Sequence, residues 1–431
     1  MDEQIDQAIG PQGGKSSLEA LIYARRWSKL LGPPALVTAG LSVITLGATA
    51  LLFRQLPESD AGILALVLAY VEILSLLGLL GQSTVITRRY SRLDPQGFAW
   101  KHDLSIIARM ALPIVILGVM VAGAVYKFDL IKLAYVGFAG ALLVPTLALI
   151  RMLNAHGRYV WSSLLLRLPN TLLALPALLF LLAPSLIGLN AVLVLHIVAI
   201  FGVGLMSLWL VRTSIKLGPV NITSAERRQG LYFLATQASL LVSFQGVIAI
   251  AGALLSPGRL AVYAAIAILF RAFKLVTSIL WMVIPPEIIR EKRPSYARLF
   301  GGTVMIAAIG GVLTLLLGPK IIQSIYGGKY DEGTFLIFWM AVAGMLLVAE
   351  VLPRSHIIGK LEWANLRPFI LVQITVMASV LPAGIWLVFH YHLLGIALAS
   401  IFTLLVRNTL AYSYFVKLLI RAPTSKSRIS S

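Results

Sequence analysis

The chain has 431 residues, of which 59% are hydrophobic and only 12% are charged, and its formal net charge is +19. A composition this apolar excludes an ordinary cytosolic enzyme and a disordered regulator. The absence of cysteine excludes disulfides, thiolate metal sites and cysteine nucleophiles. The sequence therefore indicates a polytopic membrane protein, with about 20 residues for each crossing.

The first part of the chain, 1–34, is polar and is interpreted as a cytoplasmic amphipathic arm. Within it, 17–31 has leucine and isoleucine on one side and basic residues on the other, which is typical of a helix lying on a membrane surface. Twelve apolar stretches follow, at 35–53, 61–84, 110–126, 133–153, 162–182, 187–210, 231–254, 260–284, 299–318, 334–353, 368–389 and 393–418. We expect an all-α protein with about twelve transmembrane helices.

These stretches divide into a first lobe of six helices at 35–210 and a second at 231–418, with a linker at 211–230 and a tail at 419–431. We expect the lobes to be pseudo-symmetric around a central cavity. Lys and Arg concentrate on alternate connections, those on the side of the N-terminus. The other side holds only Arg54, Lys127, Lys132, Arg259, Lys320 and Lys329. The positive-inside rule then places both termini, the linker and the tail in the cytoplasm.

Three basic residues, Arg271, Lys274 and Arg407, fall near the middle of the eighth and twelfth stretches. A cation at a helix centre costs about 2.5–3.5 kcal/mol on insertion scales, so it usually faces a cavity or a partner. Arg271 and Lys274 are three residues apart and share one helix face. They predict contact with an anionic ligand; the alternatives are a buried ion pair with an acid elsewhere, or snorkelling to the interface.

Glu72 is the one acid near the middle of a stretch, since Glu350 lies close to a helix end. It is a candidate proton-coupling carboxylate, and equally a candidate counter-ion of Arg271. When the second and eighth stretches are aligned at an offset of 199 residues, Glu72 falls on Arg271. This internal repeat favours a cleft lined by the first, second, seventh and eighth helices.

Hydroxyl side chains recur on one face of the first and seventh helices. The matching sets are Thr38, Ser42, Thr45 and Thr49, and Tyr232, Thr236, Ser239 and Ser243. Thr45 and Ser239 are the candidate cavity residues of these two sets, and simple helix packing is the alternative. Arg407 with Asn408, and Arg167 with Pro169 and Asn170, are further polar interruptions that line the cavity or mark a kink.

The sequence holds little that suggests catalysis. His390 and His392 have ligand-like spacing but lie at a predicted turn without an acid beside them. The chain has no Gly-x-x-x-x-Gly-Lys-Ser/Thr loop for nucleotide phosphates. We therefore expect neither an enzyme nor a bound metal or cofactor.

Several segments carry a resemblance to a known family. They are Leu-Pro-Glu-Ser-Asp-Ala-Gly at 56–62, Leu-Gly-Gln-Ser-Thr-Val-Ile-Thr-Arg-Arg at 80–89, Val-Tyr-Ala-Ala at 262–265, Pro-Pro at 285–286 and Ile-Tyr-Gly-Gly-Lys-Tyr at 325–330. In this order and spacing the chain resembles bacterial polysaccharide flippases, those of O-antigen or exopolysaccharide, in the multidrug/oligosaccharidyl-lipid/polysaccharide exporter superfamily. The resemblance extends over nearly the whole chain.

The resemblance implies two six-helix lobes around a cationic cavity that opens to one side at a time. It implies that the protein moves undecaprenyl-diphosphate-linked oligosaccharide across the bacterial plasma membrane. Our hypothesis from the residues is that Arg271 and Lys274 contact the diphosphate, and that Arg407 and Arg167 add positive potential. Lipid-linked peptidoglycan precursor flippases of this superfamily usually have fourteen helices, and the twelve predicted here disfavour that substrate.

Other functions remain alternatives at this point. A cation-coupled multidrug exporter of the same superfamily ranks second. A site for cationic drugs favours carboxylates, whereas the predicted cleft has a net positive charge. A major facilitator lacks support, because 88–92 does not supply the basic loop expected after its second helix. A membrane-embedded glycan polymerase or ligase would need a larger outer loop than 319–333. We expect a monomer that binds membrane lipids and no nucleic acid, with a glycan polymerase and glycosyltransferases as candidate partners.

Overall fold

The computed structural model describes residues 15–92, 94–182, 188–241, 245–290, 296–360 and 363–421. Nearly all of these residues are helical. In the first half the helices are α2 (Lys15–Gln55), α3 (Glu58–Gly78), α4 (Gln82–Tyr90), α5 (Trp100–Tyr126), α6 (Leu130–Ala155), α7 (Tyr159–Thr171), α8 (Ala174–Leu182) and α9 (Leu189–Ser214). In the second half they are α10 (Ser224–Leu241), α11 (Val247–Leu254), α12 (Pro257–Ile266), α13 (Ile268–Arg290), α14 (Tyr296–Tyr326), η3 (Asp331–Gly333), α15 (Leu336–Ala349), α16 (Val351–Lys360) and α17 (Trp363–Arg421). The predicted all-α class is confirmed.

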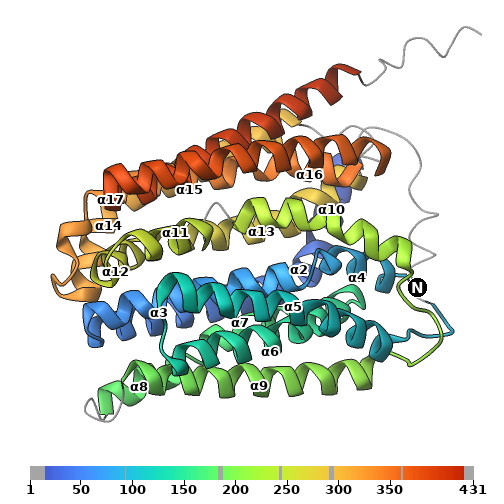
Figure 1. Ribbon diagram of the computed structural model, residues 1–431. Coiled ribbons are helices and arrows are strands. Elements are labelled where there is room, and N and C mark those ends of the chain that lie inside the picture. Colours follow the sequence, from blue (N-terminus) through green and yellow to red (C-terminus); the bar gives the residue numbers. More distant parts are fainter. Residues whose placement is uncertain are drawn as a thin grey trace, which may run out of the picture.

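The helices of the described ranges fit the prediction of about twelve membrane crossings. In the described ranges, nine helices are long and apolar enough to cross a membrane, and the bent pair α12–α13 is a tenth. The 59 residues of α17 would extend about 88 Å, nearly three times the thickness of the hydrocarbon core. A non-helical backbone at His392 (φ 50°, ψ −119°) divides α17 into two crossings. α10 and α11 follow one another in Figure 1 and cover most of the stretch predicted as the seventh crossing, 231–254.

Several predicted helices are broken in the structure. The second stretch ends as α3 at Gly78, and Leu80 and Gly81 (φ 48° and 70°) turn the chain into α4. The fifth splits into α7 and α8 just after Pro169, which removes a backbone donor and favours a kink. The eighth bends by 46° between α12 and α13. Hydropathy marks the crossings but is insensitive to these turns.

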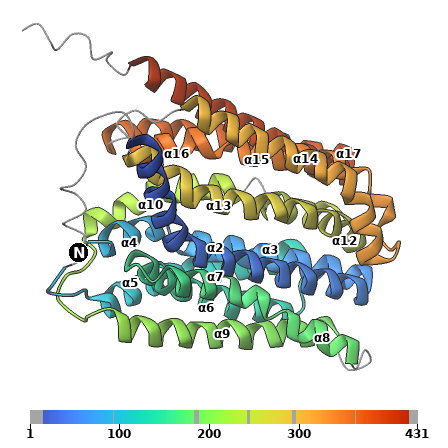
Figure 2. The same ribbon diagram turned by 180° about the vertical axis from the view of Figure 1, so that it is seen from behind.

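The helices are arranged in two outer groups with a middle layer between them, and the outer surface of the bundle is apolar. Figures 1 and 2 show α14 to α17 on one side and α5 to α9 on the other, with α2, α3 and α10 to α13 between them. We call α2 to α9 the first lobe and α10 to α17 the second lobe. Large apolar side chains such as Leu36, Phe138 and Leu182 are exposed, which fits an outer surface covered by lipid tails.

The bundle has two distinct ends. We call the end that holds the end of α17 and the N-terminal part of α2 the terminal end, and the opposite one, with the C-terminus of α2, the distal end. Figure 2 shows the beginning of α2 running across the bundle and its later part running along it. The beginning of α2 is the helix predicted at 17–31, and 32–55 is the first span.

Backbone pairing attaches the connection between the lobes to the first lobe at the terminal end. Phe98 N donates to Lys216 O (3.0 Å), and Ala99 N donates to Val220 O (2.7 Å). The buried Asp103 carboxylate accepts a hydrogen bond from the backbone of Ile222 (3.2 Å) and another from the Tyr90 hydroxyl (2.9 Å). The connection after α9 is therefore fixed to the first lobe by these hydrogen bonds.

Candidate functional site

Arg271 lies where the two lobes meet inside the bundle. It follows the bend between α12 and α13, about 20 Å along the helix pair from Pro257. Its Nη1 atom donates a hydrogen bond to the Thr49 hydroxyl on α2, at 3.0 Å. The Arg271 side chain is nevertheless exposed, so it borders space that neighbouring side chains do not fill.

Glu72 faces the same region from the first lobe. It lies on α3, about 20 Å along the helix from Glu58, and its side chain is exposed. One carboxylate oxygen accepts a hydrogen bond from Gln245 Nε2, which belongs to the second lobe. Glu72 and Arg271 thus each make a polar contact across the junction between the lobes.

Three cations lie within electrostatic range of Glu72. They are Arg167 on α7, Arg271 on α13 and Lys274, also on α13. Lys274 is also close enough to Arg167 and Arg271 to be repelled by both. We call these four residues the charge cluster. With three cations and one carboxylate its formal charge is +2, which favours an anion over a cation as a bound ligand.

Arg167 adds an unsatisfied donor to the charge cluster. Its side chain is half-buried, and its Nε atom is buried without a hydrogen-bond partner among the described residues. A buried donor left unpaired costs free energy, and such atoms in a native structure often indicate an absent ligand or water. The helix breaks after Pro169, as the interpretation of this segment as a kink predicts. A role of Arg167 in lining a cavity stays a prediction.

Thr45 lies one helical turn before Thr49, and its hydroxyl forms hydrogen bonds with residues of the first lobe. Its hydroxyl donates to Leu41 O (2.8 Å) and lies 2.9 Å from the Thr171 hydroxyl, so it joins α2 to α7. Thr49, one helical turn later on the same face, is the hydroxyl that meets Arg271. Ser239 belongs to α10, and its side chain falls outside the described part of the structure.

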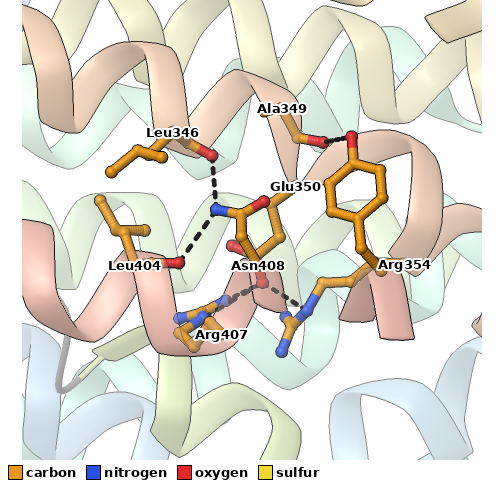
Figure 3. A network of polar contacts seen from close by, with 8 residues as sticks. Leu346, Ala349, Glu350, Arg354, Leu404, Arg407 and Asn408 are labelled. Atoms are coloured by element: carbon orange, nitrogen blue, oxygen red, sulfur yellow. Dashed lines mark hydrogen bonds and ion pairs between the residues drawn. The ribbon is translucent and has the colours of Figure 1, made fainter. Parts of the chain in front are cut away.

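Arg407 belongs to a different cluster, inside the second lobe. Its side chain is 2% exposed, and its Nε and Nη2 atoms donate to the same carboxylate oxygen of Glu350, at 3.1 and 2.7 Å. Arg354 also forms an ion pair with that oxygen, as Figure 3 shows. The structure does not bring Arg407 to Glu72: instead of lining a cavity beside the charge cluster, as proposed from the sequence, Arg407 forms a buried ion pair with Glu350.

Hydrogen bonds around this ion pair also connect α15 to α17, and the ion pairs of Glu350 connect both α15 and α17 to α16. Asn408 Nδ2 donates to the carbonyls of Leu346 and Leu404, both at 2.9 Å, and the Tyr412 hydroxyl donates to Ala349 O at 2.9 Å (Figure 3). Glu350 lies at the end of α15, as the sequence predicts, but it is only 3% exposed. Arg354, assigned to a connection by the sequence, belongs to α16 and is buried as well.

Two residues that the structure brings to the charge cluster have only weak signals in the sequence. Thr49 is the last member of the hydroxyl face of the first helix, and its spacing from Thr45 places both on one side of α2. Gln245, like Gln237, is a weak polar candidate in the seventh apolar stretch, and only the fold shows that it meets Glu72. Among the described residues, no group of three or more His, Asp or Glu side chains is arranged to hold a metal ion.

The arrangement defines a multi-pass membrane protein whose charged groups gather where two helical lobes meet. No protein-family model matches the chain, and no curated protein matches it. Several solved structures do match. The MATE multidrug transporter DinF-BH, solved as a complex with a bound compound, is 13% identical, with a TM-score of 0.61, and the match covers 95% of this chain and 97% of that one.

Two further structures extend the comparison. The lipid II flippase MurJ, in an inward closed conformation, is 12% identical over 90% of each chain, with a TM-score of 0.58. A multidrug resistance MATE family transporter of the MOP superfamily, in an outward-facing conformation, is 14% identical, with a TM-score of 0.55, over 90% of this chain and 96% of that one. The chain therefore has the fold that these transporters share.

Proposed function

We propose that the protein is a transporter that moves a lipid-linked oligosaccharide across the bacterial plasma membrane by alternating access. The fold supports the class, because the similar structures are transporters and a flippase. The charge cluster carries the choice of cargo. Its three cations and one carboxylate give a formal charge of +2, which matches the two negative charges of a diphosphate diester.

The physical requirement is to carry polar groups past hydrocarbon. A diphosphate and a glycan would lose their hydration in the bilayer without compensation. Arg271 and Lys274 on α13 and Arg167 on α7 would supply charge-assisted hydrogen bonds to the diphosphate. The undecaprenyl tail would stay in the bilayer while the lobes move relative to each other. Glu72 would act as the counter-ion that these cations keep while no cargo is bound.

The other assignments follow from the same proposal. The terminal end would face the cytoplasm, because basic residues concentrate in its connections. The protein would work as a monomer, beside the glycosyltransferases and polymerase that make and extend the glycan. Arg407 would stabilise the second lobe through Glu350 rather than contact the cargo. Thr45 and Ser239 remain proposed cavity residues.

A multidrug exporter is the second candidate, and one observation favours it. The exposed carboxylate of Glu72 is a group that attracts organic cations, and the similar structure DinF-BH is a multidrug transporter. The excess of positive charge around Glu72 opposes a cationic drug, so we rank this function second. Both functions use the same lobes and differ in the sign of the cargo.

The deciding experiment is a deletion strain in which lipid-linked glycan intermediates and surface polysaccharide are measured together. We expect intermediates to accumulate on the cytoplasmic leaflet while surface glycan is lost. The wild-type gene and Arg212→Ala, a matched change at an exposed arginine outside the cluster, should restore both. Arg271→Ala should not, at equal abundance in the membrane. Normal surface glycan in the deletion strain, with raised drug sensitivity, would instead identify the exporter.

A further inference from the structure

The two lobes are also joined at the distal end, by the turn that follows α14. Gly327 and Gly328 adopt positive φ angles of 62° and 90°, which glycine tolerates without strain. They reverse the chain directly after α14 and direct Lys329 and Tyr330, which belong to the second lobe, toward the last turn of α2 in the first lobe.

Lys329 caps the C-terminus of α2. Its ammonium group donates to the carbonyl oxygens of Phe53 (3.0 Å), Arg54 (3.4 Å) and Leu56. The last carbonyls of a helix lack partners within the helix, and the helix dipole makes this end negative, so a cation is favourable here. Burial lowers the pKa of Lys329, and the charge of Glu58 opposes that shift. The ammonium has thus exchanged part of its water for carbonyls of the other lobe.

Tyr330 makes a second bond to the same helix end. Its side chain is completely buried, and its hydroxyl donates to Phe53 O at 2.9 Å. The ring packs edge-on against Tyr326, with centroids 5.0 Å apart. Leu52, Phe53 and Leu56 of the first lobe belong to the same apolar core as Tyr330. Separation of the lobes here would expose this core and leave the Phe53 carbonyl without its partners.

The neighbouring helices approach as closely as backbones allow. A Cβ atom on Gly62, at the start of α3, would lie 1.8 Å from the carbonyl oxygen of Pro257, at the start of α12. Only glycine fits at this contact. The distal end is therefore closed by two adjacent contacts, α2 with the turn after α14 and α3 with α12.

We propose that Lys329 and Tyr330 form a latch that holds the distal end closed and must release before the cavity can open there. The proposal rests on alternating access, as part of the proposed function, but not on the identity of the cargo. The latch bonds described above are to backbone carbonyls at the end of α2, so the latch depends on the position of the helix end rather than on the side chains there. Release would return the ammonium to water and leave the α2 carbonyls free to be hydrated.

The absence of cysteine allows a direct test with a single introduced thiol. Leu56→Cys places a thiol at a residue that is 1% exposed beside the latch while keeping the backbone carbonyl. Purified full-length protein in lipid nanodiscs, where both ends are accessible, is treated with a polar maleimide, and the labelling rate is measured. Without cargo, the parent protein, which carries Leu56→Cys and an intact latch, should label slowly. Addition of Lys329→Met should make labelling about tenfold faster, because bonds made by a charged group are lost.

Two matched variants make the result specific. Lys329→Arg keeps the charge and should stay close to the parent rate. Tyr330→Phe removes only one hydroxyl and should raise the rate about threefold, as expected for a neutral hydrogen bond. A thiol at the exposed Lys320 on α14 should label equally in every background, and this control reports on folding and access. Equal labelling of Leu56→Cys in the parent, Lys329→Met and Tyr330→Phe proteins would overturn the latch, whatever cargo the transporter carries.

Discussion

Arg271 of the second lobe donates a hydrogen bond to Thr49 of the first, over 3.0 Å. The residue expected to bind an anion is therefore also a contact between the lobes. Cargo that accepts a hydrogen bond from Nη1 of Arg271 would compete with Thr49 for that donor. Binding and separation of the lobes are then linked, because one group cannot serve both partners equally well.

Replacement of Arg271 tests the cationic site directly. Arg271→Ala should weaken binding of a short-chain polyprenyl diphosphate by about ten- to a hundredfold, the equivalent of one charge-assisted contact. Arg271→Lys should recover part of the affinity, since it keeps the charge but loses the planar fork of donors. Calorimetry on purified protein measures both. Unchanged affinity in a folded Arg271→Ala protein would contradict the assignment.

The charge of Glu72 separates the two candidate functions. Glu72→Gln removes the carboxylate but retains an amide oxygen that can accept from Gln245. The cluster loses its one negative charge, and its net positive charge rises by one. A site for a diphosphate should then bind it more tightly and be less able to bind a lipophilic cation. The measurement compares a polyprenyl diphosphate with tetraphenylphosphonium in parallel titrations. Loss of diphosphate binding would show that Glu72 itself organises the site.

The ion pair of Glu350 should matter for stability rather than for cargo. Glu350→Gln leaves Arg354 and Arg407 without their shared carboxylate, and we expect it to destabilise the protein by about 3–5 kcal/mol. The combined variant Glu350→Leu, Arg354→Met and Arg407→Met removes all three charges and should recover most of that loss. Thermal unfolding in detergent measures both. Failure of the stable triple variant to transport would show that at least one of these three charged residues has a direct role in transport.

The close approach of α3 and α12 gives an independent change at the distal end. Gly62→Ala places a methyl group against the Pro257 carbonyl, where the fixed backbone leaves no room, so the helices must move apart. We expect faster labelling of the Leu56→Cys thiol even with Lys329 intact. Gly258→Ala is the matched control, because its Cβ meets no atom closer than 3.8 Å. Similar rates for both alanine variants would show that this contact does not hold the end closed.

Hydropathy predicts the twelve crossings well, because each apolar stretch needs the full thickness of the bilayer. The breaks within them are harder to predict, because a turn such as that at Leu80 and Gly81 or at His392 changes direction without changing composition. The four residues of the charge cluster stand out in the sequence because an intramembrane charge is costly. The internal repeat predicts proximity only for the first, second, seventh and eighth predicted stretches. Arg167 lies on α7, which belongs to the fifth stretch, so the repeat does not predict its position near Glu72.

Partners far apart in the chain could not be assigned from the sequence. Arg407 and Arg271 look alike there, since each is an arginine inside an apolar helix. The difference between them is the position of Glu350, 57 residues before Arg407, and only the packing of α15 and α16 against α17 brings the two together. Lys329 likewise looks like an ordinary loop cation until the fold brings it to the C-terminus of α2.

The pairing of Phe98 with Lys216 and Val220 has a mechanical consequence. Because the connection after α9 is bonded to the first lobe almost as far as Ser224, little free chain remains between the lobes. Beside it, Gln82 of α4 donates to the carbonyl of Arg227 in α10, at 3.0 Å. The lobe movement proposed above would therefore be smallest at this edge and largest at the edge farthest from α4.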